Sequence, residues 1–331
     1  MNRIAIIGAG IAGLTLARRL APHAEITVFE KSRGVGGRMA TRRLDEFEFD
    51  HGAQFFTARS DAFQAFLKPL INQGLVQQWQ PRVMTLAEGE KPYRRDWFEP
   101  HYVAVPTMTA LCKTLAENLP MAMNTRIDKL VSTAEGWALV VDNDAGDART
   151  IDGHFDWVIS TAPYPQTAAL LSSHLASTIA ERTTAALSPC YTLMLGFDNP
   201  LPLTFQAARL KHPAIDWLTL NNSKPGRSPS TSLVMHSTPH WAQQHLDEDR
   251  DMVQAQLVEA LESVLGNPLP TPATSALHCW RYARVEQASE DDFVIDLDNR
   301  LAACGDWCID QRVEAAWQSA SRLADHLETV L

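Results

Sequence analysis

The sequence has no long apolar run, and this absence excludes membrane proteins at the start. Its first hydrophobic stretch, Ile4 to Ile7, ends directly in glycines. That is far shorter than the core of a signal sequence or the ~18 uncharged residues that a membrane helix needs. We therefore expect a soluble, cytoplasmic protein with no membrane partner.

Positive charge is also scarce. The 331 residues contain 29 Lys and Arg against 39 Asp and Glu, a formal net charge of −10. Such a field repels polyanions, so nucleic acid is not an expected partner. With 45% hydrophobic and 21% charged residues, the chain has an ordinary globular composition. Its length indicates two domains, or one with a large insertion.

Cysteine is sparse and shows no pairing pattern. The five cysteines are Cys112, Cys190, Cys279, Cys304 and Cys308. With no CxxC pair among them, neither a disulfide framework nor a structural zinc site is indicated, and we expect reduced thiols. His236, His240 and His245 also lack the spacing of metal ligands. No metal site is predicted.

What the sequence does contain is a complete nucleotide-binding pattern at its front. A β-branched run at residues 4–7 is typical of a buried strand, GxGxxG follows it, and residues 14–20 have helical spacing. A second apolar run, residues 25–29, ends at an acid about 20 residues after the first glycine. The residues that carry this pattern are Gly8, Gly10, Ala12, Gly13 and Glu30.

Each part of this pattern has a physical role in binding a dinucleotide. The first glycine permits a tight turn, the second lets a pyrophosphate approach the backbone, and the third lets helix and strand pack closely. The diphosphate sits at the helix N-terminus, where free N–H groups and the positive end of the dipole face it. Glu30 accepts hydrogen bonds from the adenosine ribose. The pattern itself leaves NAD and FAD open.

A glycine-rich basic loop directly after this acid favours FAD. Residues 34–38 read Gly-Val-Gly-Gly-Arg and resemble the GxGGR loop of the flavin amine oxidase superfamily, which wraps the cofactor diphosphate. The resemblance implies noncovalent FAD with contacts from Lys31, Gly36, Gly37 and Arg38. A planar guanidinium at Arg38 suits an oxyanion, although a solvated basic loop is the alternative.

A second segment, residues 50–57, narrows the resemblance to the renalase family and its bacterial members. It reads Asp-His-Gly-Ala-Gln-Phe-Phe-Thr and resembles a DxGAQYFT-type segment that passes the flavin ring. This implies that Ala53, Gln54 and Phe55 lie near the isoalloxazine. Phe55 and Phe56 are otherwise read as plain core aromatics.

A third segment lies near the C-terminus. Residues 301–307 read as a short strand ending in Gly305 and Asp306, and a helix is expected to begin at Val313. Superfamily members place such an Asp on the ribityl chain, and they point this helix N-terminus at the flavin N1/C2 region, where negative charge gathers on reduction. The resemblance also places Ile127 by the adenine.

Matches to the renalase pattern continue through residues 216–225, 234–238 and 278–283. Renalases oxidise the 2- or 6-dihydro isomers of NAD(P)H to NAD(P)+ and pass the electrons to dioxygen as hydrogen peroxide. The resemblance implies an FAD-dependent oxidase whose partners are a dihydronicotinamide dinucleotide and O2. The alternative is a flavin amine oxidase acting on a small amine, although its aromatic pair near the C-terminal motif is missing.

Hydride transfer to a flavin needs a stacked donor and exclusion of water more than it needs an acid or base. Candidate site residues are therefore groups that wall the pocket or hold the substrate, since an anionic substrate of an acidic protein needs local cations. These candidates are His236, Trp280, Phe55, Asn221, Lys224, Arg281 and Arg284. His236 and Trp280 are equally readable as core residues.

The predicted fold class is α/β, with a Rossmann-like FAD-binding domain of the flavin amine oxidase and p-hydroxybenzoate hydroxylase type and an α+β substrate domain. We assign residues 1–61, 105–165 and 295–331 to the FAD-binding domain and residues 62–104 and 166–294 to the substrate domain. Apolar spacing predicts helices at 61–70, 107–119, 168–186 and 247–265, and a strand beginning at 125–127. The oligomeric state is not indicated.

Overall fold

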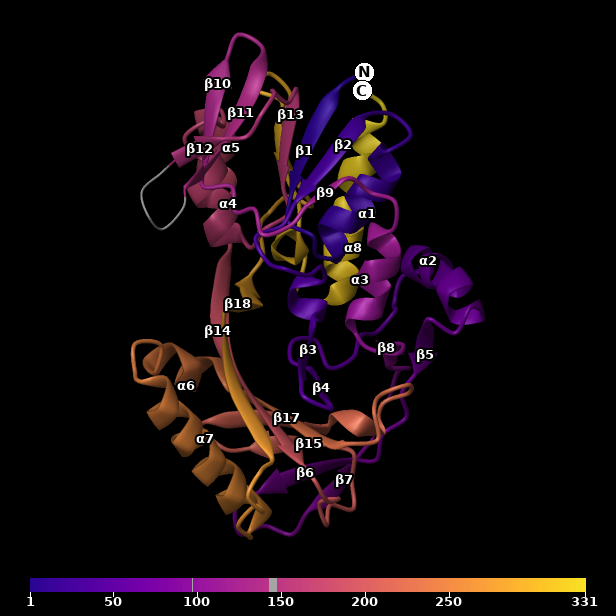
Figure 1. The fold of residues 1–331 in the computed structure, drawn as a ribbon, viewed down its shortest axis with the longest axis vertical. Helices are drawn as coiled ribbons and strands as arrows, with labels where there is room; N and C mark the ends of the chain where they lie inside the picture. Colours follow the sequence, from indigo (N-terminus) through magenta and orange to yellow (C-terminus); the bar gives the residue numbers. More distant parts are fainter. Residues whose placement is uncertain (97, 143–147) are drawn as a thin grey trace. The chain divides into compact units, whose positions relative to one another are not determined.

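The computed structural model describes residues 1–96, 98–142 and 148–331, and the chain forms two compact units (Figure 1). Unit 1 comprises Met1–Gly37, Cys112–Leu187 and Val285–Leu331, and unit 2 comprises Arg38–Leu111 and Ser188–Arg284. Residues 38–61, which we assigned to the FAD-binding domain, therefore lie in unit 2. No helix in the described ranges is long and apolar enough to span a bilayer.

Unit 1 is built on a six-stranded sheet in the order β19-β20-β13-β1-β2-β9. β1 pairs in parallel with β2 and β13, and β13 pairs in parallel with β20. The strands are β1 (Arg3–Ile7), β2 (Glu25–Phe29), β9 (Met121–Ala122), β13 (Trp157–Ser160), β19 (Val294–Asp296) and β20 (Leu301–Ala303). Their apolar runs are those of strands buried on both faces. This sheet confirms the predicted Rossmann-like fold.

Helices and a small antiparallel sheet complete unit 1. α1 (Ile11–Leu20) packs against α8 (Val313–Leu327). The small sheet contains β10 (Lys129–Thr133), β11 (Gly136–Asp142) and β12 (Ala148–Thr150), and two short helices, α4 (Tyr164–Leu171) and α5 (Ser177–Arg182), follow it in the chain. The core of the unit contains Phe29, Leu130, Val158 and Trp307.

Two local predictions in unit 1 were wrong. The helix expected at 168–186 is interrupted between α4 and α5, where Ser172 and Ser173 are poor helix formers. The strand expected at 125–127 is absent, since the chain turns at Asn124, whose φ is +52°. The Thr125 N–H then donates to the Glu30 carbonyl at 2.8 Å, which takes these residues out of the sheet.

Unit 2 is built on a seven-stranded sheet in the order β18-β14-β17-β16-β15-β6-β7. The strands are β6 (Val83–Ala87), β7 (Tyr93–Arg95), β14 (Ala186–Phe197), β15 (Ala207–Lys211), β16 (Ile215–Leu220), β17 (Thr231–Ser237) and β18 (Thr274–Gln287). α7 (Arg250–Leu265) packs on one face, where Leu257 and Leu261 belong to the same core cluster as Leu233 and Met235 of β17. The preceding helix is α6 (Pro239–Gln244).

The opposite face of this sheet is covered by the hairpin of β3 (Thr41–Leu44) and β4 (Phe47–Asp50). Phe47 and Phe49 pack there against Met194 and Val234. The remaining elements are α2 (Asp61–Asn72), β5 (Val76–Gln78), β8 (Tyr102–Ala104) and the 3-10 turns Gly37–Met39, Asn221–Ser223 and Asp306–Cys308, with α3 (Thr109–Ala116) leading back to unit 1. β4 ends at Asp50, so the residues that follow Asp50 start on this same face of the seven-stranded sheet.

Candidate functional site

The turn from β1 into α1 presents the N-terminus of a helix with no side-chain cap. Gly10 occupies the N-cap position, and no side chain accepts from the first amides of the helix. A Cβ at Gly10 would meet no atom within 4 Å. Open space therefore lies in front of amides that point outward with the positive end of the helix dipole, which is an anion-binding arrangement.

The two flanking glycines serve the packing of the same turn. A Cβ at Gly13 would lie 2.0 Å from the carbonyl oxygen of Gly8. Gly8 has a φ of +113°, and a Cβ there would lie 2.7 Å from Thr161 Oγ1. A side chain at either position would thus collide with the turn or with its neighbouring strand end. Gly10 is the member of the three that leaves room for a ligand.

Glu30 joins the end of β2 to this turn. Its side chain accepts from the Ala9 N–H at 2.9 Å and from the Ser32 N–H at 2.8 Å. The residue is 7% exposed. A carboxylate has about four acceptor positions, so ribose hydroxyls find acceptors beside the two backbone amides. The carboxylate is thus fixed where the sequence pattern predicts it.

The predicted glycine-rich loop lies against the same turn. The Gly36 N–H donates to the Ala9 carbonyl at 2.8 Å. Gly36 and Gly37 have φ values of +119° and +52°, which favour glycine. A Cβ at Gly37 would lie 3.6 Å from the Gly10 Cα. The residues of this turn and loop fit the adenosine diphosphate half of FAD.

The C-terminal motif of unit 1 is tightly packed. A Cβ at Gly305 would lie 2.8 Å from Trp307 Nε1, and this indole donates to the Ala162 carbonyl at 3.1 Å. Asp306 is buried, and its carbonyl oxygen accepts from two following amides at 2.8 Å. Val313 begins α8, which has no side-chain cap at its N-terminus. The predicted contact of Asp306 with the ribityl chain stays a prediction.

Other predicted cofactor residues of unit 1 have varied surroundings. Ala12 is buried within α1, and Ile127 is 8% exposed within the core. Lys31 is exposed, with Nζ 3.4 Å from Gln166 Oε1. Their contacts with FAD remain predictions.

In unit 2, the segment after β4 crosses the sheet face opposite α7. The His51 carbonyl accepts from Thr192 Oγ1 and from Trp280 Nε1, each at 2.9 Å. His236 Nε2 lies 3.3 Å from Gln54 Nε2. Thr192 of β14 and His236 of β17 are register partners, so both side chains share this face. The strands thus fix the segment that sequence resemblance places at the flavin ring.

The start of this segment lies close to Arg38. A Cβ at Gly52 would lie 2.0 Å from the Arg38 carbonyl oxygen, and the Ala53 N–H donates to that oxygen at 2.7 Å. The half-buried Arg38 side chain donates to the Ala283 carbonyl at 3.3 Å. Its predicted contact with a phosphate or the flavin edge stays a prediction.

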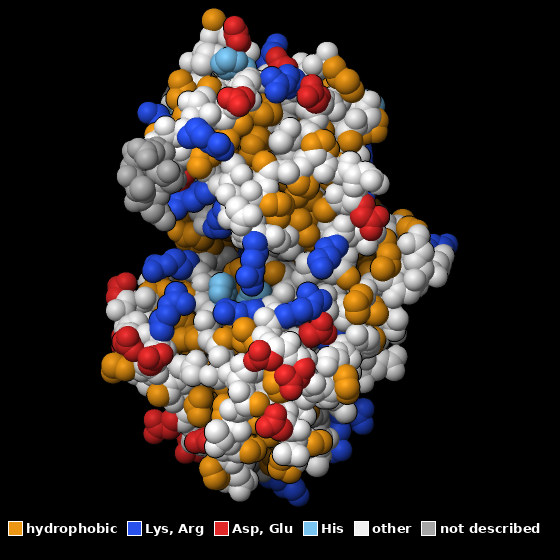
Figure 2. Space-filling view, in the orientation of Figure 1, with side chains coloured by type: hydrophobic (Ala, Val, Ile, Leu, Met, Phe, Trp, Pro, Cys, Tyr) orange, Lys and Arg blue, Asp and Glu red, His pale blue; other side chains and the backbone are white. Residues whose placement is uncertain are grey.

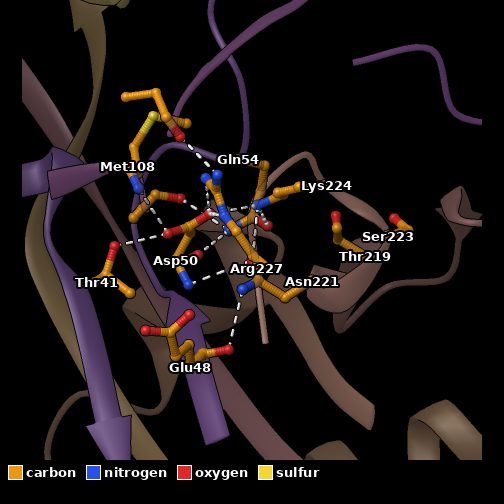
Figure 3. Close-up of polar contacts among 12 residues, drawn as sticks. Thr41, Glu48, Asp50, Gln54, Met108, Thr219, Asn221, Ser223, Lys224 and Arg227 are labelled. Atoms are coloured by element: carbon orange, nitrogen blue, oxygen red, sulfur yellow. Dashed lines mark hydrogen bonds and ion pairs between the residues drawn. The ribbon is translucent and has the colours of Figure 1, made fainter. Parts of the chain in front are cut away.

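A buried charge cluster lies beneath the segment (Figure 3). Asp50 Oδ2 lies 3.1 Å from Lys224 Nζ and 2.7 Å from Arg227 Nη2, and these three side chains are at most 1% exposed. Asp50 Oδ1 accepts from Thr41 Oγ1 at 2.7 Å and from the Met108 N–H at 3.1 Å. Burial alone raises the pKa of Asp50, but Lys224 and Arg227 outweigh it and hold that pKa well below its ordinary value. Two cations thus share one carboxylate.

Lys224 links this cluster to Gln54. Its ammonium also donates to Asn221 Oδ1 at 2.8 Å and to Gln54 Oε1 at 3.1 Å. Burial lowers the pKa of Lys224 to about 8, although Asp50 raises it. Because Lys224 holds Oε1 of Gln54, the amide NH2 faces the Asp50 carbonyl and His236. Lys224 therefore fixes the orientation of the Gln54 side chain.

Four imidazoles of this unit have pKa values well below the ordinary value. Burial, together with the charges of Arg284 and Lys224, lowers the pKa of His236 to about 3. A neutral His236 accepts from the Gln54 amide through Nε2. Burial is also the largest cause that lowers the pKa to about 4 in His51, His101 and His278.

Aromatic rings surround the two ends of the segment. The Phe55 ring centroid lies 4.4 Å from that of His101 and 5.8 Å from that of Trp217. Trp280 stacks on His51 at 5.0 Å. The predicted wall residues Phe55 and Trp280 are therefore placed by contacts with the same segment.

The structure brings together most of the candidates that the sequence predicts in unit 2. Gln54, Lys224, Asn221 and His236 share one hydrogen-bond network, in which Asn221 and Lys224 are 0% and 2% exposed. Their polar groups turn inward, to Asp50 and its neighbours. Arg281 is exposed on β18 and lies outside this network. Substrate contact by these residues stays a prediction.

Sequence reasoning assigned no role to Arg227 or to Asp50. Two cations flank a Pro-Gly turn at residues 224–227, and Gly226 there has a φ of +75° with Val105 2.6 Å from a Cβ position. That doublet of cations was an available signal. Its acidic partner is 177 positions away in the sequence, so spacing could not identify it.

The cysteines and acids form no metal site in the described ranges. No group of three His, Cys, Asp or Glu side chains is placed there to hold an ion. All five cysteines are free thiols. Burial raises the pKa of Cys112 and Cys308 to about 12 and that of Cys190 to about 11, so these thiols are not poised as nucleophiles.

Known families and proteins resemble the chain over most of its length. A family model described as flavin containing amine oxidoreductase matches residues 94–327, and one described as an NAD(P)-binding Rossmann-like domain matches residues 6–70. Renalase from Mus musculus is 26% identical over 316 residues, covering 88% of this chain and 87% of that protein.

Solved structures share the fold at low sequence identity. A protein from Exiguobacterium sp. 255-15, provisionally assigned as a protoporphyrinogen oxidase, has a TM-score of 0.76 at 14% identity and covers 100% of this chain and 99% of its own. A redesigned putrescine oxidase has a TM-score of 0.68 at 12% identity, covering 99% of both chains.

Proposed function

Because the chain belongs to the flavin containing amine oxidoreductase family, with noncovalent FAD as its cofactor, we propose that it oxidises dihydronicotinamide dinucleotides whose hydride sits at the 2- or 6-position. The substrate gives up one hydride and becomes NAD(P)+. Dioxygen takes the electron pair with two protons, one from the solvent, and becomes hydrogen peroxide. Similarity to renalase along nearly the whole chain supports this proposal.

The observation that carries the choice of substrate is the excess of positive charge beneath Gln54. Among the described residues, Asp50 is the one carboxylate paired with Lys224 and Arg227, and all three are buried. The charge of Arg284 also acts on His236 nearby. An ammonium substrate is repelled by such a field, whereas a dinucleotide with two phosphates is attracted.

Residues of unit 1 would bind the cofactor by its adenosine diphosphate. The amides at the start of α1 face the diphosphate, with Gly10 leaving the space that it needs. Glu30 would accept from the ribose hydroxyls, since its carboxylate is fixed by two backbone amides. The chemistry that FAD supplies when bound is acceptance of a hydride and transfer of the electron pair to dioxygen.

Residues of unit 2 would hold the nicotinamide ring and exclude water. Hydride removal from a dihydronicotinamide leaves no proton for a base to take, and the neutral His236 fits this requirement. Gln54, held by Lys224 and by the Asp50 carbonyl, would fix the segment that borders the ring. The rings of Phe55 and Trp280 would limit the access of water.

Steady-state oxygen uptake tests this function against its alternative, a flavin amine oxidase acting on a small amine. The alternative is favoured by the family to which the chain belongs. We expect 2- or 6-dihydro-NAD to consume one O2 and to yield one hydrogen peroxide and one NAD+. The amine panel would contain putrescine, a longer polyamine and an aromatic amine. The proposal would be overturned if an amine turned over and no dihydronicotinamide did.

A further inference from the structure

Asp216 is the residue of a β-bulge on β16, and because it follows Ile215, its side chain lies on the sheet face that carries His236. Ile215 opposes Ser237 and Trp217 opposes His236 on β17, so Asp216 is an extra residue between two regular pairs. Ile215 packs in the core on the α7 side. Without the bulge, Trp217 would share that side, because alternate residues of a strand point the same way.

The bulged acid joins two arginines that come from different strands. Asp216 Oδ1 lies 2.9 Å from Arg209 Nη2 of β15, and Asp216 Oδ2 lies 2.8 Å from Arg284 Nη2 of β18. The acid side chain is 8% exposed, whereas those of Arg209 and Arg284 are 49% and 30% exposed. Both oxygens of the Asp216 carboxylate are thus paired. The three side chains carry one net positive charge, and the two guanidinium groups are the exposed part of the group.

Both arginines have N–H donors beyond those that pair with Asp216. Within the part of the chain that the structure describes, Arg284 hydrogen-bonds only to Asp216, which leaves Nε and Nη1 available. Arg209 likewise pairs only with Asp216 among the described residues. Figure 2 shows several Lys and Arg side chains on the lower half of the view, where unit 2 lies in Figure 1. A planar guanidinium with two free donors matches the oxygens of a phosphate.

We propose that Arg209, Asp216 and Arg284 form a phosphate-binding subsite that takes the pyrophosphate of the dinucleotide substrate. The proposal rests on the proposed function for the identity of the ligand. Asp216 is a positioning residue here, since it holds both guanidinium groups on the two oxygens of one carboxylate. Asp216 also neutralises one of the two guanidinium charges when no substrate is bound.

Binding of inorganic pyrophosphate to the FAD-loaded protein tests the subsite without turnover. We expect Arg284→Gln to weaken pyrophosphate binding in calorimetry by about 10- to 100-fold, the effect of losing a charge-assisted pair of hydrogen bonds. Arg209→Gln should weaken it in the same direction. The control is Arg95→Gln, an exposed arginine at the end of β7, which removes the same charge and should leave binding unchanged. Equal binding by Arg284→Gln and Arg95→Gln would overturn the proposal.

Truncated substrates separate the subsite from the reaction. For Arg284→Gln we expect KM for the dihydronicotinamide dinucleotide to rise about 10- to 100-fold, while KM for the dihydronicotinamide riboside, which lacks phosphate, and kcat for both stay unchanged. Arg284→Lys should recover part of the loss. If no dihydronicotinamide turns over, the proposed function fails, yet the pyrophosphate result still decides the subsite. If riboside and dinucleotide are affected equally, the subsite fails while the oxidase function stands.

Discussion

The nucleotide turn of unit 1 and the charge cluster of unit 2 are built by opposite means. The turn offers backbone amides, and Gly8, Gly10 and Gly13 all come from one short stretch of chain. The cluster uses side chains from distant positions, such as Asp50 and Arg227, and buries them completely. A backbone site therefore depends on the space left beside glycine, whereas a side-chain site depends on the balance of buried charge.

The largest effect is expected from the glycine that serves packing. Gly13→Ala puts a Cβ 2.0 Å from the Gly8 carbonyl oxygen, and both partners are backbone, so the turn must deform at a cost of at least about 4 kcal/mol. Gly10→Ala is the matched control, since its Cβ meets nothing. We expect urea unfolding of its apoprotein to change by less than about 1 kcal/mol, with flavin retention lost. Wild-type flavin content in Gly10→Ala would show that the space beside Gly10 is not needed for cofactor binding.

The next largest effect is expected from the one acid in the buried cluster. Asp50→Asn leaves Lys224 and Arg227 buried without a counter-charge, so unfolding free energy should fall by about 3–5 kcal/mol in urea titrations. Glu99→Gln breaks an ion pair with Arg59 at the surface and should change it by at most about 1 kcal/mol. Similar losses in the two variants would show that burial does not set the strength of the Asp50 cluster.

A smaller effect is expected from the pH dependence of Lys224. Its pKa in the fold, about 8, is below the ordinary value of 10.5, so the folded state binds fewer protons than the unfolded state between these values. Stability from this group therefore rises with pH through that window, by about 2–3 kcal/mol. Unfolding of wild type and Lys224→Met at pH 7 to 10.5 measures the difference. A parallel pH dependence in both proteins would contradict it.

The smallest effect is expected from the imidazoles. Because the pKa of His236 is about 3 and those of His51, His101 and His278 are about 4, all four stay neutral from pH 5 upward. We expect kcat for the dihydronicotinamide to be level between pH 5 and 7, in contrast with the rise expected for an enzyme with an ordinary histidine base. A sigmoid near pH 6.5 that disappears in His236→Asn would reject this account.

The site of unit 1 was predictable because its signals are local. The order of β1, α1 and β2, the three glycines and Glu30 all follow from spacing within the first 30 residues, and the structure places them as predicted. The period of apolar residues likewise predicted α7 and α8. Backbone sites of this kind are readable because the same short segment makes both the turn and the ligand contacts.

The site of unit 2 was only partly predictable, since pairing across the fold decides it. Resemblance singled out Gln54, Lys224 and His236, but neither spacing nor period indicates that Asp50 neutralises Arg227. The bulge at Asp216 depends on the register of β16 against β17, which one strand alone does not encode. The turn at Asn124 was missed because it is stabilised by the carbonyl oxygens of Glu30 and Ser32, which follow the neighbouring strand and accept from the Thr125 and Asn124 N–H groups.

Anaerobic single-turnover mixing tests the central claim most directly. The purified flavoprotein is mixed with one equivalent of 2-dihydro-NAD or 6-dihydro-NAD, and the absorbance of the oxidised flavin is followed together with the formation of NAD+. We expect at least one isomer to bleach the flavin stoichiometrically while putrescine and aromatic amines leave it oxidised. Bleaching by an amine alone, with both dihydronicotinamides inert, would contradict the account.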